Sequence, residues 1–456
     1  MLRKNDPQWL RYTPPFLRRR LEGRVSLHGI LHNIGWLFFD KILRMGVGLL
    51  VGVWVARYLG PQQFGLLNFA TALSGMFGAV AALGLKGIAV RDIVRDPDRT
   101  RLTLGTAALL QLIGRTVAYL LLLGTIAYLR PDDALARWIV ALLGFVMVLK
   151  VSEIAEYWFE AKVQSKYTVW VQNSVFLFVA AAKALLIVMH APLIAFVWAT
   201  VAEAAIGASI LLVVMGRQGL ALADLQASVG RAKELLKDSW PLILSSVAIM
   251  VYMKVDQIML AEMLGDESVG VYSAAVRMSE VWYFIPVAIV ASVNPSIIQA
   301  KKQGEELYYA RLQQLYGVMS SISVPVAIVM TFFSGIIVDM LFGSAYAAAS
   351  SVLAIHIWTA VFVFMGLVSS KWFMIEHLQK ITFRRTMLGA VINVALNLWL
   401  IPKYGINGAA IATVAAQGSG TLLCDPLRKE TRRLFFMKMA SLNPINILSL
   451  RAWRSV

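Results

Sequence analysis

The sequence predicts an all-α, polytopic membrane protein of about twelve transmembrane helices. These are expected to form two six-helix bundles related by a pseudo-twofold axis along the membrane normal. The first observation is composition: 59% of the 456 residues are hydrophobic, only 15% are charged, and the mean hydropathy is +0.68, far from a soluble chain. The second is a series of apolar runs, each about the 20 residues that cross a hydrocarbon core. The third is an internal repeat.

Twelve apolar runs, separated by short polar connectors, are predicted to cross the membrane. They cover residues 34–57, 64–86, 102–129, 135–158, 168–189, 192–215, 239–263, 268–292, 314–340, 350–372, 381–401 and 406–424. The predicted domains are a basic N-terminal segment (1–33), a first six-helix lobe (34–215), a linker (216–238), a second six-helix lobe (239–424) and a basic tail (425–456). The N-terminal segment has no short apolar core before a small-residue cleavage site, so no cleaved signal is expected.

The repeat relates the first two predicted helices to the seventh and eighth. YLGPQQFGLLNFA at residues 58–70 returns in nearly the same pattern as MLGDESVGVYSAA at residues 263–275, 205 residues further on. That offset corresponds to six predicted spans. A repeat displaced by an even number of crossings keeps its orientation, which predicts parallel repeats.

Two glycines in each copy give the repeat a physical meaning. Gly60 and Gly265 are expected to end one helix, where a left-handed backbone is easily adopted. Gly65 and Gly270 begin the next helix, where the lack of a side chain permits close backbone approach. The alternative is that short connectors favour glycine for no further reason.

Positive charge is concentrated on one side of the predicted topology. The net charge is +17, and Lys and Arg gather in alternate connectors such as 86–101, 217–237 and 371–385. The positive-inside rule then places both termini in the cytoplasm. Because topology explains the charge and no compact soluble basic domain is present, no nucleic-acid partner is expected. The single cysteine, Cys424, excludes an internal disulfide.

Twelve of the ionisable residues inside predicted spans are candidate site residues. The cations, interpreted as a substrate-binding cavity, are Lys41, Arg44, Arg115, Lys150, Lys183, Lys254 and Arg277. The carboxylates, candidates for carrying the coupling ion, are Asp40, Glu153, Glu203, Asp256 and Glu280. At roughly 2.5 to 3.5 kcal/mol each, seven cations facing lipid would cost about 17 to 25 kcal/mol. They are therefore expected to line a cationic, water-filled space between the bundles or to pair across helices. For Arg277 with Glu280 a purely structural ion pair is the alternative, and for Lys183 it is snorkelling.

Several catalytic motifs are absent from the sequence. It has no Walker loop, no GxSxG and no HExxH. We therefore expect no ATP-driven transport, no cofactor and no metal site. A membrane polysaccharide polymerase or ligase is the enzyme alternative. Such enzymes need a sizeable external loop, and the longest predicted external loop has about ten residues.

These residues together resemble the polysaccharide-unit flippases, the Wzx-like O-antigen transporters of the superfamily that includes the multidrug and toxic-compound exporters. The resemblance runs from about residue 30 to residue 424. It rests on the block YMKVDQIMLAEMLGDESVGVYSAAVRMSEVWYFIPVAIVASVNPSI at 252–297, and on VARYLGPQQFGLLNFA, LGLKGIAVRDIVRD, IAFVWATVAEA and YGINGAAIAT.

The resemblance implies a bacterial inner-membrane flippase, not an enzyme. It would move undecaprenyl-pyrophosphate-linked oligosaccharide across the membrane by alternating access, coupled to H⁺ or Na⁺ as an antiporter, with membrane lipids around it. A polysaccharide polymerase and chain-length proteins are candidate partners. The alternative within the superfamily is a cation-coupled multidrug exporter, although a cationic cavity disfavours a cationic substrate.

Overall fold

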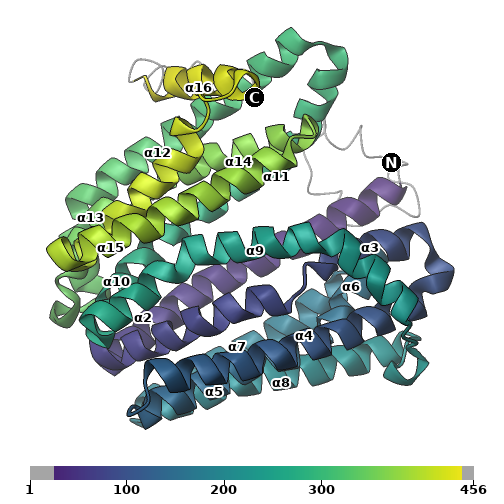
Figure 1. Ribbon diagram of the computed structural model, residues 1–456, viewed down its shortest axis with the longest axis horizontal. Coiled ribbons are helices and arrows are strands. Elements are labelled where there is room, and N and C mark those ends of the chain that lie inside the picture. The colour runs from purple at the N-terminus through teal and green to yellow at the C-terminus, as the bar shows by residue number, and fades with distance from the viewer. Residues whose placement is uncertain (1–24, 444–456) are drawn as a thin grey trace, which may run out of the picture.

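The protein is built of helices joined by short turns (Figure 1). The computed structural model describes the backbone of residues 25–443 and the side chains of residues 43–443. The α-helices are α2 (Val25–Ala81), α3 (Leu85–Arg95), α4 (Thr100–Leu129), α5 (Ala134–Leu149), α6 (Glu153–Ala161), α7 (Lys166–Val188), α8 (Leu193–Arg217), α9 (Val229–Leu264), α10 (Asp266–Glu280), α11 (Phe284–Gln303), α12 (Glu305–Phe342), α13 (Ala349–His356), α14 (Thr359–Ile375), α15 (Gln379–Gly418) and α16 (Lys429–Leu442). Short 3₁₀ segments are η2 (Pro97–Arg99), η3 (Lys150–Ser152), η4 (Leu222–Asp224), η5 (Val281–Tyr283) and η6 (Ser344–Tyr346), and η7 (Ser419–Leu423) is a π-helical turn.

Ten helical segments in the described part of the chain are long and apolar enough to cross a membrane. Two of them each contain two predicted spans. Residues 43–95 bend at Gly60 (φ 70°), and residues 379–423 bend at Gly405 (φ 58°). The twelve predicted spans therefore all lie on mainly helical chain, and the predicted all-α class is confirmed.

The helices form two bundles that lie side by side in Figure 1. Helices α2 to α8 make one bundle, here called the N-lobe, and α9 to α15 make the other, the C-lobe. Helix α9 lies between the two and contacts α2 on one side and α15 on the other. Helix α16 follows the last span and lies against α12.

The repeat glycines join the lobes. Gly60 and Gly265 both have positive φ, 70° and 89°, so each ends a helix as predicted. A Cβ added at Gly65 would overlap the backbone carbonyl of Asp266, and one added at Gly270 would overlap that of Pro61. The two copies of the motif therefore contact each other reciprocally, as a pseudo-twofold axis requires, and the close backbone approach predicted for the second glycines is confirmed.

Apolar packing continues across this contact. One core cluster runs through both lobes and includes Phe64 and Phe69 of α2 together with Tyr272 of α10. The Tyr346 hydroxyl donates to the carbonyl of Ala56, 2.7 Å away, which ties η6 of the C-lobe to α2 of the N-lobe. The lobes are thus fastened at the end where the repeat turns lie. This end follows the first predicted span, so it is extracytoplasmic if the N-terminus is cytoplasmic, as predicted.

Candidate functional site

The N-lobe contains two adjoining cavities. The first has a volume of about 240 Å³ and lies between α2, α7 and α8. The second, of about 380 Å³, lies between α2, α5, α7 and α8. Thr200 and Glu203 of α8 line both. The two cavities therefore form one polar region inside the lobe.

Arg277 brings a cation from the C-lobe into the first cavity. Its guanidinium lies 5.3 Å from the ring centroid of Phe64 and directly against Gly52, where any side chain would overlap it. Lys183 lines the same cavity, and its Nζ is 3.9 Å from Glu203 Oε2. Two cations thus share this cavity with one carboxylate.

Arg44 and Lys150 line the second cavity together with three carboxylates, Glu153, Glu156 and Glu203. Arg44 Nε donates to Asn173 Oδ1 at 3.2 Å. The 3₁₀ turn η3 breaks the helical path at Lys150. Lys150 therefore reaches the cavity from a bend in the chain.

Arg115 lies behind this wall. It is 2% exposed, and its guanidinium donates to the carbonyl of Met147 and to Glu153 Oε2, both at 2.8 Å. It ties α4 to the bend between α5 and α6. Its charge also offsets that of Glu153, so the cavity walls and Arg115 together carry five cations and three carboxylates. The region is cationic on balance.

In the C-lobe, Asp256 belongs to a buried cluster of oxygen atoms. It is 4% exposed, and Oδ2 accepts a hydrogen bond from the Tyr272 hydroxyl. The Tyr272 hydroxyl is 3.4 Å from Thr413 Oγ1, which accepts from Asn393. Asn397 donates to Asn393 Oδ1, and its own Oδ1 is buried without a hydrogen-bond partner. Carboxylate, amide and hydroxyl oxygens are the ligands that hard cations prefer.

The remaining predicted residues are more scattered. Lys254 and Glu280 are half-buried in the C-lobe and line neither N-lobe cavity. The backbones of Asp40 and Lys41 lie within α2, but their side chains fall outside the described residues. Within the described range, no three His, Cys, Asp or Glu side chains are grouped to hold a metal ion.

Several polar residues of the site were not predicted. Gln172 and Asn173 hydrogen-bond to Glu156 and Arg44, and Asn393 and Asn397 build the cluster at Asp256. Each is an amide inside an otherwise apolar run. An amide carries no charge, so a search for intramembrane charges does not detect it. The available signal was a polar residue in the middle of an apolar span.

The comparisons with known proteins agree with this architecture. The family model described as "Polysaccharide biosynthesis protein" matches residues 30–301, and the MatE model matches residues 241–399. The "Probable low-salt glycan biosynthesis flippase Agl15" of Haloferax volcanii is 26% identical over 411 residues, which cover 85% of this chain and 81% of that protein. The "Putative O-antigen transporter" of Shigella flexneri is 24% identical over 406 residues, 84% of this chain and 94% of that protein.

Solved structures show the same fold at low sequence identity. The inward-facing conformation of a multidrug resistance MATE family transporter aligns with a TM-score of 0.69 and 14% identity, over 89% of this chain and 96% of that one. The lipid II flippase MurJ, in an inward closed conformation, aligns with a TM-score of 0.65 and 15% identity, over 90% and 91%. Because the family model spans more than half of the sequence, this chain belongs to the polysaccharide biosynthesis protein family of multi-pass membrane proteins.

Proposed function

We propose that this protein is a flippase that moves undecaprenyl-pyrophosphate-linked oligosaccharide across the bacterial inner membrane by alternating access. The observation that carries the proposal is the first N-lobe cavity, where Arg277 of the C-lobe joins Lys183. A pyrophosphate loses its hydration when it enters the membrane, and paired cations replace it, with arginine well suited to phosphate oxygens. Both termini would be cytoplasmic, and a polysaccharide polymerase and chain-length proteins would act on the product.

A cation shared by both lobes suits alternating access. Arg277 belongs to α10 but lines a cavity of the N-lobe, so the lobes cannot separate here without moving it away from Lys183. Anion binding would thus depend on which conformation the lobes adopt. The sequence relatives are named as flippases and transporters rather than as catalysts, which supports transport over polymerase or ligase chemistry.

The test is to delete the gene in its native host and follow surface polysaccharide together with lipid-linked sugars in each leaflet. Wild type and Lys403→Ala, a cation beside Trp399 away from the cavity, are expected to restore export. Arg277→Ala is expected to leave lipid-linked units on the cytoplasmic leaflet, and Arg277→Lys to restore export in part. Accumulation of single units on the outer leaflet would instead identify a polymerase or ligase.

Coupling to H⁺ or Na⁺ is proposed to run through Asp256. Its carboxylate lies among hydroxyl and amide oxygens of α10 and α15, and a buried carboxylate changes its charge state or its cation when the helices around it move. In proteoliposomes, Asp256→Asn is expected to abolish the dependence of flipping on an imposed H⁺ or Na⁺ gradient. Asp132→Asn, on an exposed connector, should retain it. Unchanged gradient dependence in Asp256→Asn would contradict this assignment.

A multidrug exporter is the second candidate, because Glu153, Glu156 and Glu203 all line the second N-lobe cavity and would attract an organic cation. The same deletion strain separates the two functions. An exporter predicts intact surface polymer and lowered tolerance of cationic drugs.

A further inference from the structure

The C-lobe has a cavity of its own, of about 330 Å³, between α9, α14 and α15. The internal repeat relates it to the N-lobe cavities. The 205-residue offset carries Arg44 to Ile249 and Gly48 to Met253. Arg44 and Gly48 line the N-lobe cavities, whereas Ile249 and Met253 line the C-lobe cavity. The two lobes therefore present cavities at equivalent places in the repeat.

The two equivalent cavities differ in chemistry. The C-lobe cavity is lined by the aromatic residues Tyr252, Tyr283, Phe362 and Phe373 and by the uncharged polar residues Ser369, Ser370, Thr382, Thr386, Gln417 and Thr421. Its lining contains no carboxylate and one cation, Arg385. The lining of the N-lobe cavities is thus rich in charged side chains, whereas that of the C-lobe cavity is rich in aromatic rings, hydroxyls and an amide.

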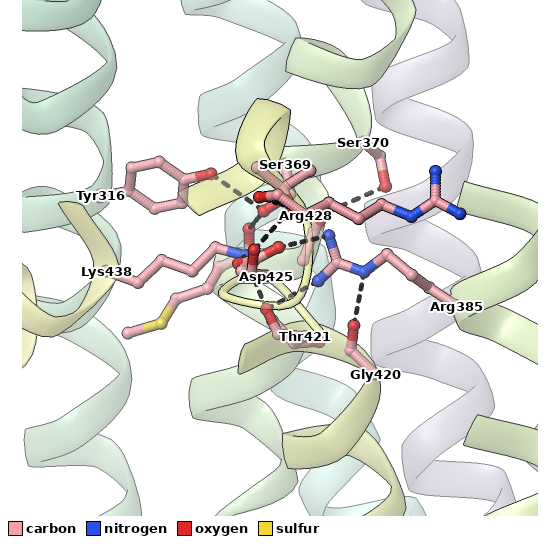
Figure 2. A network of polar contacts seen from close by, with 12 residues as sticks. Tyr316, Ser369, Ser370, Arg385, Gly420, Thr421, Asp425, Arg428 and Lys438 are labelled. Carbon is pink, nitrogen blue, oxygen red and sulfur yellow. Dashed lines mark hydrogen bonds and ion pairs between the residues drawn. The ribbon is translucent and has the colours of Figure 1, made fainter. Parts of the chain in front are cut away.

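Arg385 is already engaged by the protein. Its Nε donates to the carbonyl of Gly420 at 2.7 Å and its Nη2 to that of Thr421 at 2.8 Å, both within the π-helical turn η7. Its Nη1 lies 2.7 Å from Asp425 Oδ1. In Figure 2, Arg385 and Lys438 reach Asp425 from opposite sides. All three guanidinium nitrogens thus already have oxygen partners within the protein, which makes the cavity a poor site for a free anion.

We propose that this C-lobe cavity binds sugar rings of the lipid-linked oligosaccharide, and this rests on the proposed function. One face of a pyranose ring is apolar and packs on aromatic side chains, while its hydroxyls need donors and acceptors; this lining supplies both. The pyrophosphate would lie on the N-lobe cations at the same time. The charged pyrophosphate would therefore bind to the N-lobe and the uncharged sugars to the C-lobe.

A lipid chain is the competing occupant, and the polar lining disfavours it. The Ser370 and Thr386 hydroxyls already donate to the carbonyls of Gly366 and Thr382, but their oxygens and the Gln417 amide would still lose water to a hydrocarbon that offers no hydrogen bond in return. Ile249 and Met253 are 48% and 39% exposed, so the cavity is reachable from the protein surface. The ring of Tyr252 is held against Gly389, where an added Cβ would lie 3.0 Å from it. The absence of a side chain at Gly389 thus leaves room for this ring at the cavity wall.

The experiment compares two probes on the full-length protein in nanodiscs. One is undecaprenyl pyrophosphate, and the other is the same lipid carrying a disaccharide of N-acetylglucosamine. Wild type is expected to bind the sugar-bearing lipid about tenfold more tightly, since a site built to hydrogen-bond a ligand discriminates against the one lacking those groups. Tyr252→Leu and Gln417→Leu are expected to remove most of this difference and leave binding of the bare lipid unchanged.

Tyr252→Phe keeps the ring and should keep most of the preference, and Trp399→Leu, outside the cavity, should keep all of it. An equal loss for both probes in Tyr252→Leu would mean that the cavity holds the isoprenoid chain. No loss in either variant would place the sugar elsewhere, and equal binding of both probes by wild type would mean that no sugar site exists. Each of these results overturns the inference while leaving flippase activity possible. Binding of neither probe by wild type would instead contradict the proposed function itself.

Discussion

Asp425 is a carboxylate with no exposed surface that is held between two cations. Lys438 Nζ lies 2.8 Å from its Oδ2 and Arg385 Nη1 lies 2.7 Å from its Oδ1. Lys438 is itself fully buried in α16 and also donates to the carbonyl of Thr421 at 2.7 Å. Through these contacts a helix that follows the last span is fixed to the C-lobe beside the proposed sugar cavity.

We expect Asp425→Asn to lower the free energy of unfolding by about 3 to 5 kcal/mol, because it leaves two buried cations without their counter-charge. The melting temperature of detergent-solubilised protein measures the effect. Asp339→Asn, on an exposed position of α12, is the matched control and should melt like wild type. A variant at Asp425 as stable as wild type would show that the cations are hydrated or neutral.

The loss at Asp425 should depend on pH. Lys438 lies in α16, outside the membrane spans, and burial lowers its pKa to about 8 although the carboxylate of Asp425 acts to raise it. Removing the carboxylate lowers this folded-state pKa further. Below pH 8 wild-type Lys438 is protonated beside Asp425, so the difference in unfolding free energy between wild type and Asp425→Asn is largest there. Above pH 8 wild-type Lys438 also loses its proton, and the difference in unfolding free energy narrows. Melting curves at pH 7 and pH 9 test this, and an equal difference at both would exclude Lys438 as its source.

At the scale of elements, the connector after α4 is joined to the C-lobe by charge. Arg130 donates to both carboxylate oxygens of Asp266, at 2.8 and 2.9 Å, and to Glu262 at 3.1 Å. Its guanidinium also lies 4.2 Å from the ring centroid of Phe69. Arg130 and Asp266 are only 12% and 10% exposed, so water weakens this contact little. The cluster holds α4 to α9 and α10 at the end predicted to be extracytoplasmic.

Arg130→Ala should shift the population towards conformations in which the lobes separate at this end. Spin labels at Asp132 of the N-lobe and Ala347 of the C-lobe, in a background where Cys424 is replaced, report the separation. Wild type should give one short distance, and Arg130→Ala a second, longer component. Arg137→Ala, on the next helix, should behave like wild type. Identical distributions in all three proteins would show that the apolar contacts alone keep this end closed.

The helices themselves were largely predictable, and the exceptions have local causes. Four predicted spans are interrupted: 64–86 at the turn that ends in Gly84, 135–158 by η3, 268–292 by η5 and 350–372 between α13 and α14. Only the break at Gly84 falls at a proline or glycine of the kind that signals a helix end. Hydropathy indicates which residues lie in the membrane, but it does not show where a single turn of α-helix is replaced by a 3₁₀ turn.

At the scale of the molecule, the repeat glycines set how closely the lobes approach. Gly65 lies against the backbone of Asp266, and Gly270 lies against that of Pro61. Any side chain at either position must push two helices apart, because backbone atoms have no alternative rotamer. This contact therefore tolerates no side chain at either glycine without a shift of the helices.

Gly270→Val is expected to loosen the whole contact. Hydrogen exchange followed by mass spectrometry should show faster exchange of amides in both 58–70 and 263–275, although only one copy is changed. Gly78→Val is the control, since nothing lies within 4 Å of a Cβ added there. Faster exchange in the changed copy alone would mean that the two copies do not stabilise each other.

The sequence by itself determined the membrane class, the helices and the parallel repeat, because each depends on composition or spacing along the chain. It also indicated the roles of the repeat glycines, because a left-handed backbone at a helix end and a close approach between two backbones both favour glycine. Only the tertiary structure decided which charges meet. Arg277 lines a cavity of the other lobe, Arg115 donates to Met147 and Glu153, and Arg385 shares Asp425 with Lys438. A charge inside the membrane needs a partner of opposite charge or a polar group. Which partner it has depends on how helices distant in the sequence pack, and the sequence of either helix alone does not determine that packing.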